Sequence, residues 1–144
     1  MKDCVIDASV AIKWVIEENG TREALAVRAH WRPLAPDLLA AECANILWKK
    51  VGRGELSVDE AQFAARLLRA SDIEFLPTPA LLEDATRLAI DMNHPAYDCL
   101  YLALAMREGC PFITADEAFV RVIHQKRPAA LDRHIVALMQ VARD

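Results

Sequence analysis

Short apolar runs alternate along this chain with longer segments whose apolar residues recur at helical spacing. The runs at residues 3–7, 33–36, 73–76 and 111–114 have the length and composition of buried strands. Because strands separated by helices build parallel sheets that are covered on both faces, this pattern predicts an α/β fold. Residues 134–138, HIVAL, fit either a strand or a helix, and we favour a strand.

The longer segments predict helices with recognisable ends. Thr21, Asp37 and Ser57 can each cap a helix, and Pro79 can open another. The last long segment before residue 111 is apolar on nearly every face, so we expect a central helix there. The expected helices span residues 10–18, 21–31, 38–51, 58–69, 79–92 and 97–107, and a further helix begins at Asp116.

The composition is that of an ordinary globular protein. The chain has 144 residues, of which 54% are hydrophobic and 26% charged, and it contains no repeat or linker that would divide it. We therefore expect one domain over residues 1–144. No apolar span is long enough for a membrane helix, and the four cysteines form no CxxC pair. Buried, reduced thiols and a cytoplasmic location are expected.

The net charge gives no general basic surface for nucleic acid. Lys and Arg number 17 against 21 Asp and Glu, which leaves a formal net charge of −4. A protein that grips nucleic acid electrostatically is usually basic, so this balance counts against such a substrate. The objection weakens if several carboxylates surround divalent cations, because bound cations reverse the local charge.

Four acidic residues occur where a metal-dependent nuclease would need them. Asp7 ends the first expected strand, and Asp116 follows the strand at 111–114 by two residues. In parallel sheets, ligands bind beyond the carboxyl ends of the strands, so both side chains can reach one site. Glu42 lies on a helix, and Asp98 opens the most apolar helix, where an unpaired charge would be costly.

Each acid also has a structural interpretation. Asp7 and Asp116 could be helix caps, and Glu42 could belong to a solvated face. Asp98 lies in a first helical turn, where the helix dipole favours a negative charge. Function is favoured for Asp98, because its surroundings are so apolar.

Carboxylate oxygens are the ligands that Mg²⁺ and Mn²⁺ prefer, and such a metal can activate water to hydrolyse a phosphodiester. The hydroxyls of Ser9 and Thr114 could orient a carboxylate or a bound water, and Asn45 and Lys49 share the helical face of Glu42. The histidines show no metal-ligand spacing, so surface or loop roles are expected for them.

Three segments of the chain resemble PIN-domain ribonucleases, most closely the VapC toxins of toxin–antitoxin pairs. They are VIDASVAIKW, PDLLAAECANILWK and YDCLYLALAMREGCPFITADEAF, and they are spread over most of the chain, from residue 5 to residue 119. The resemblance implies a three-layer α/β/α sandwich with a central parallel sheet. It also implies a Mg²⁺- or Mn²⁺-dependent endoribonuclease that acts on RNA, forms a homodimer and has a cognate antitoxin.

In the same family, the metal site corresponds to Asp7, Glu42, Asp98 and Asp116. Some members carry another acid two residues beyond the last of these, where this chain has Ala118, and residues 121–133 match the family least. A catalytically silent PIN domain that only binds a protein or RNA is an alternative. A signalling domain with an acceptor aspartate is another, although Phe75-Leu76-Pro77 ends the third strand without an acid.

Overall fold

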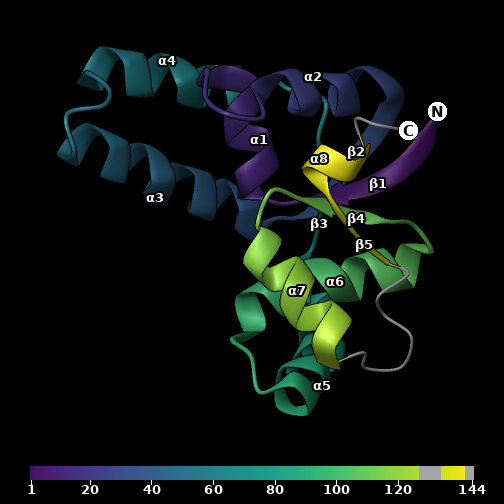
Figure 1. The fold of residues 1–144 in the computed structure, drawn as a ribbon. Coiled ribbons are helices and arrows are strands. Elements are labelled where there is room, and N and C mark those ends of the chain that lie inside the picture. The colour runs from purple at the N-terminus through teal and green to yellow at the C-terminus, as the bar shows by residue number, and fades with distance from the viewer. Residues whose placement is uncertain (127–133, 142–144) are drawn as a thin grey trace.

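A five-stranded parallel sheet forms the centre of the protein (Figure 1). The computed structural model describes residues 1–126 and 134–141. The strands lie in the order β3-β2-β1-β4-β5, and every neighbouring pair is parallel. Their bounds are β1 Lys2–Ile6, β2 Trp31–Pro36, β3 Glu74–Leu76, β4 Phe112–Thr114 and β5 Ile135–Ala137. The expected strands are confirmed, including the one favoured at residues 134–138.

Helices cover both faces of this sheet. Figure 1 shows α1, α2 and α8 on one side and α5, α6 and α7 on the other, so the three-layer α/β/α sandwich is confirmed. The α3–α4 hairpin extends from the first layer beyond the sheet. The helices are α1 Ala8–Val15, α2 Thr21–His30, α3 Leu38–Gly52, α4 Val58–Arg69, α5 Leu82–Met92, α6 Ala96–Glu108, α7 Glu117–Lys126 and α8 Leu138–Val141.

Helix α6 is the central helix of the fold, as its apolar sequence predicted. Every residue from 99 to 105 is buried, because α5 covers one side of α6 while β1, β2 and β4 lie against the other. Before it, Asn93 adopts a left-handed conformation with φ of 50°, which ends α5 and turns the chain into α6. The sheet and α6 therefore share one continuous core.

Several predicted helix ends were wrong, and each has a local reason. Helix α1 ends at Val15 rather than residue 18, because Ile16 is extended. Thr21 does not cap α2: its hydroxyl accepts from Glu18 N at 2.9 Å and donates to Ile16 O at 3.2 Å, which closes the turn before α2. The cap position of α2 belongs to Gly20, whose φ of 92° suits a residue without a side chain.

The predicted cap at Ser57 is confirmed, whereas the one at Asp37 is wrong. Ser57 and Glu60 form a reciprocal capping box at the start of α4. The Asp37 carboxylate makes no cap bond and instead accepts from the backbone N–H and the hydroxyl of Thr78. A short 3₁₀ turn at Thr78–Leu81 takes the place of the expected first turn of α5.

Three further expectations concern the cysteines, membrane-spanning helices and residues 121–133. Within the described residues, the four cysteines are free and buried, as expected. None of the helices in these ranges has the length and apolar character to cross a bilayer. Of the segment 121–133, residues 121–126 belong to α7, whereas 127–133 lie outside the described residues.

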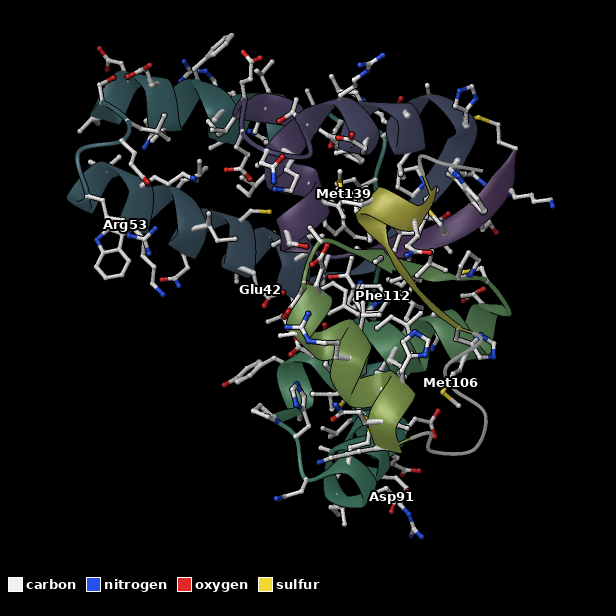
Figure 2. The ribbon with its side chains drawn as sticks, viewed as in Figure 1. Glu42, Arg53, Asp91, Met106, Phe112 and Met139 are labelled. Carbon is white, nitrogen blue, oxygen red and sulfur yellow. The ribbon has the colours of Figure 1, made fainter. Side chains whose placement is uncertain are left out.

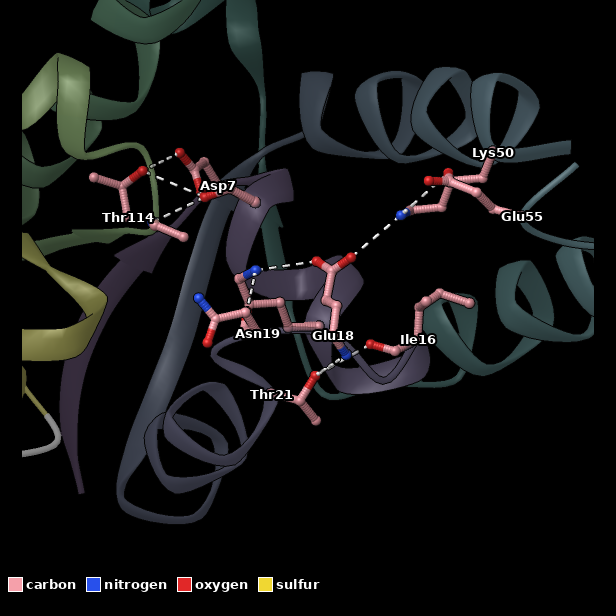
Figure 3. Close-up of polar contacts among 11 residues, drawn as sticks. Asp7, Ile16, Glu18, Asn19, Thr21, Lys50, Glu55 and Thr114 are labelled. Carbon is pink, nitrogen blue, oxygen red and sulfur yellow. Dashed lines mark hydrogen bonds and ion pairs between the residues drawn. The ribbon is translucent and has the colours of Figure 1, made fainter. Parts of the chain in front are cut away.

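A charge network fixes α3 against the end of α1. The ammonium of Lys13 lies 3.0 Å from Glu18 Oε1, and that of Lys50 lies 3.2 Å from Glu18 Oε2 (Figure 3). Lys50 also lies 3.9 Å from Glu55. Burial raises the pKa of Glu18, but the bonds from the two lysines outweigh it and hold that pKa below its usual range.

We expect Glu18→Gln to lower the free energy of unfolding at about pH 7 by about 1 kcal/mol, since the site is partly exposed and solvent screens the pair. The pKa of Glu18 is depressed in the folded state, so its contribution is present above the unfolded pKa and disappears as the pH falls below about 4. Urea unfolding across this range measures the effect. Glu17→Gln, at the exposed neighbouring position, is the control; an equal and pH-independent loss in both variants would contradict the prediction.

Candidate functional site

The candidate site lies where the connections of the sheet change direction. From β1 the chain proceeds outward to β2 and β3, and it later returns to the other side of β1 with β4 and β5. Ligands of open parallel sheets bind at such a point, beyond the carboxyl ends of the two central strands. Asp7 follows β1 directly, and Asp116 comes two residues after β4.

Asp7 is buried and held by two hydroxyls. Its Oδ1 accepts from Ser9 Oγ and its Oδ2 from Thr114 Oγ1, both at 2.5 Å (Figure 3). The residue is 9% exposed and makes no cap bond to α1, so the helix-cap interpretation of Asp7 is wrong. Ser9 and Thr114, whose hydroxyls were expected to orient a carboxylate or a bound water, therefore hold Asp7 itself.

The environment of Asp7 disfavours its negative charge. Burial, mainly, raises its pKa to about 6; the charges of Asp98 and Glu42 add to this, while the bonds from Ser9 and Thr114 oppose it. The pKa of Glu42 is raised as well, by burial and by Asp98, against the hydrogen bond from Tyr101. The three carboxylates thus lie close enough to repel one another, and a bound cation would relieve that repulsion.

Glu42 is brought to this region by the sheet end of α3, as Figure 2 shows. Its Oε1 accepts a short hydrogen bond from the hydroxyl of Tyr101 on α6, which is 1% exposed. Glu42 is therefore partly buried and bonded to α6, whereas Asn45 and Lys49 on the same helical face are exposed. The sequence did not single out Tyr101, because a tyrosine inside an apolar helix has the pattern of a core residue.

Asp98 has the partner that its apolar helix required. His94 Nε2 lies 2.8 Å from Asp98 Oδ2, and the side chain of His94 is 20% exposed. Since a carboxylate can only accept, the imidazole donates. His94 lies in the loop between α5 and α6, as expected, but it is partly buried and bonds one of the four acids. Its spacing of four residues from Asp98 was a usable signal, but Pro95 between them made a shared helical face uncertain.

Asp116 does cap a helix. Its Oδ1 accepts from the backbone N–H of Phe119 at 3.1 Å, in the first turn of α7. Its own backbone N–H donates to Thr114 Oγ1 at 3.0 Å, so the hydroxyl that holds Asp7 also fixes the start of α7. The Ser9 hydroxyl accepts from Ala115 N at 2.9 Å and ties α1 to the same loop.

Asn45 and Lys49, which share the helical face of Glu42, make no hydrogen bond to any of the four acids within the described residues. Both side chains are exposed on α3. The cysteines beside the acids are poor ligands: burial raises the pKa of Cys43 to about 12 and that of Cys99 to about 11, so both remain thiols.

The oxygen donors of these acids fit Mg²⁺ or Mn²⁺, although their side chains do not converge on one position. Across residues 1–126 and 134–141, no three His, Cys, Asp or Glu side chains form a group placed to hold a metal. Mg²⁺ usually takes one or two carboxylates and completes its shell with waters and substrate phosphates. Asp7, Glu42 and Asp98 supply oxygen donors and an uncompensated negative charge, which suits that mode.

Comparison with known proteins agrees with this geometry. The chain is 34% identical over 128 residues to "Ribonuclease VapC3" from Pyrobaculum aerophilum, covering 87% of this chain and 95% of the relative. It is 28% identical over 113 residues to "VapC ribonuclease Mb0985" from Mycobacterium bovis, covering 78% and 84%. The crystal structure of PAE2754 from Pyrobaculum aerophilum superposes with a TM-score of 0.68, at 20% identity and 99% and 98% coverage, and supports the fold.

The fold and the site together define a class: a parallel α/β/α protein that gathers carboxylates at the switch point of its sheet. Within that class the chain belongs to the PIN domain family, because the model of that family matches residues 4–125. The resemblance noted in the sequence is confirmed.

We expect Asp7→Asn to stabilise the metal-free protein at about pH 8. The raised pKa means that the folded state binds the Asp7 proton more tightly than the unfolded state does. The free energy of unfolding that this proton contributes is fully present below about pH 4 and is lost as the pH rises through about 6. A rise of the pKa from about 4 to about 6 corresponds to on the order of 3 kcal/mol of folding free energy. A neutral Asn side chain avoids that loss at every pH. Urea unfolding in EDTA measures the difference.

Asp72→Asn, at an exposed position, is the matched control and should change little. A variant at Asp7 that is less stable than the natural protein at about pH 8 would show that the ionised carboxylate is well accommodated.

Proposed function

We propose that this protein is an endoribonuclease, the toxin of a toxin–antitoxin pair, and that it hydrolyses RNA with Mg²⁺ or Mn²⁺. The observation that carries the proposal is the buried carboxylate of Asp7, which lies at the switch point of a PIN domain and feels the charges of Glu42 and Asp98. A buried carboxylate beside two further acids is costly, and functional sites are where such a cost is retained. Both VapC relatives are named as ribonucleases.

In this proposal Asp7, Glu42, Asp98 and Asp116 hold the metal. A bound divalent ion would supply an activated water and neutralise charge on the scissile phosphate. Ser9 and Thr114 hold both oxygens of Asp7, so its carboxylate presents a fixed direction to the ion. Glu42 and Asp98 are each held by one donor at one oxygen, which leaves the other oxygen free of a described partner. Rigid ligands of this kind favour one orientation of the phosphate.

The partners of the proposed toxin are RNA, a cognate antitoxin and a second copy of the chain. Exposed apolar side chains support the presence of protein partners: Trp48 is 69% exposed on α3, Phe63 is 56% exposed on α4 and Ile90 is 70% exposed on α5. We further propose that residues 1–144 form one PIN domain that acts in the cytoplasm, where free buried thiols such as these persist.

We expect the purified protein to cut structured RNA in the presence of Mg²⁺ or Mn²⁺ and not in EDTA. Asp7→Ala and Asp98→Ala should each lower the cleavage rate on the order of 10²-fold or more, because each removes a charged oxygen ligand from the site. Gel analysis of end-labelled transfer and ribosomal RNA measures the rates.

Asp91→Ala is the matched control, since Asp91 lies at the far end of α5 from Glu42 (Figure 2) and pairs with Arg87 on the surface. Circular dichroism establishes that each variant is folded. Folded natural protein that binds metal but cuts none of the RNAs would favour the silent PIN domain, whose role is to bind a partner.

A further inference from the structure

Four aromatic rings form a row between the sheet and the α5–α7 layer. The ring of His94 lies 4.7 Å from that of Phe119, Phe119 lies 6.4 Å from Phe112, and Phe112 stacks on Tyr101 at 5.6 Å, between ring centroids. We call His94, Phe119, Phe112 and Tyr101 the aromatic row. Its members come from α6, β4, α7 and the turn before α6, so it joins elements that are distant in sequence.

Three members of the aromatic row each bond a different carboxylate of the candidate site. His94 donates to Asp98 Oδ2 at 2.8 Å, and the hydroxyl of Tyr101 donates to Glu42 Oε1. The backbone N–H of Phe119 donates to Asp116 Oδ1 at 3.1 Å. The fourth acid, Asp7, is held by Ser9 and Thr114 instead.

The row is rigid because its interior is almost fully buried. Tyr101 and Phe112 are 1% exposed and Phe119 is 2% exposed, and the ring of Phe112 extends from β4 toward α6, where it stacks on Tyr101 (Figure 2). Close-packed rings in contact with one another cannot swing independently. The donors at its two ends therefore keep a constant separation, and so do the carboxylate oxygens that they bond.

We propose that His94 and Tyr101 are positioning residues: His94 sets the orientation of Asp98, Tyr101 sets that of Glu42, and the aromatic row fixes the two relative to each other. Outer-shell donors of this kind direct a ligand's second oxygen toward a cation, and their loss commonly costs metal affinity or activity by about 10–100-fold. This proposal rests on the proposed nuclease function, because it assigns these residues to the same site.

The test removes the polar atoms and keeps the rings. Tyr101→Phe deletes one oxygen atom from a buried ring. His94→Phe keeps the contact with Phe119 but has no donor, whereas His94→Gln keeps a donor amide. Tyr97→Phe and His30→Gln are the matched controls, because both side chains are exposed.

Three measurements are made on each protein: the dissociation constant for Mn²⁺ by electron paramagnetic resonance, the rate of RNA cleavage, and the melting temperature. We expect Tyr101→Phe and His94→Phe to weaken Mn²⁺ binding and to slow cleavage about 10–100-fold. His94→Gln should recover most of both, and the controls should match the natural protein. Recovery by Gln separates positioning from packing, since Phe preserves the packing better.

Mn²⁺ affinity and cleavage unchanged in Tyr101→Phe and His94→Phe would overturn the positioning proposal while leaving the nuclease function intact. If the natural protein itself neither binds Mn²⁺ nor cuts RNA, both proposals fall together. Tyr101→Phe carries the test alone if a variant at His94 does not fold.

Discussion

The pairing of β1 with β4 is the constraint on which the rest of the structure depends. Ile6 lies opposite Ile113 in this parallel register, so the next residues, Asp7 and Thr114, meet at the carboxyl edge although 107 residues separate them. Their hydrogen bond, with the one from Ser9, joins the end of β1, the start of α1 and the loop that leads to α7. A one-residue slip in this register would turn both polar side chains away from each other.

The burial of Asp7 at this contact lowers the free energy of unfolding when its carboxyl group is ionised. Two hydroxyl donors stabilise the Asp7 carboxylate, yet burial and two neighbouring acids still raise its pKa to about 6. A protein selected only for stability would carry a neutral residue there. The arrangement is consistent with a site in which a ligand of positive charge completes the electrostatics, and it explains why stability and activity are expected to respond in opposite directions at this position.

Much of the fold could be predicted from the sequence, because strands, the central helix and the Ser57 cap depend on short-range patterns of apolar and capping residues. The four acids could also be selected as candidate site residues, since each lies near a strand end or on a predicted helix. Ser9 and Thr114, the partners of Asp7, could be named as well, whereas the partner of Glu42 was missed for a physical reason. Tyr101 meets Glu42 across 59 residues, and nothing local distinguishes a hydroxyl that bonds a carboxylate from one that fills the core.

The lysines of α1 and of the outer half of α3 bear on how an acidic protein could hold RNA. Lys13 and Lys50 are mostly buried and are committed to Glu18, so they neutralise the protein's own carboxylate rather than a phosphate. Exposed Arg53 lies at the outer end of α3 (Figure 2), away from Glu42 and partly paired with Glu55. Lys13 and Lys50 therefore offer phosphates little positive charge, and in the proposed function a bound metal would supply such charge at the site. Metal and RNA are therefore expected to bind cooperatively, each lowering the electrostatic cost of the other.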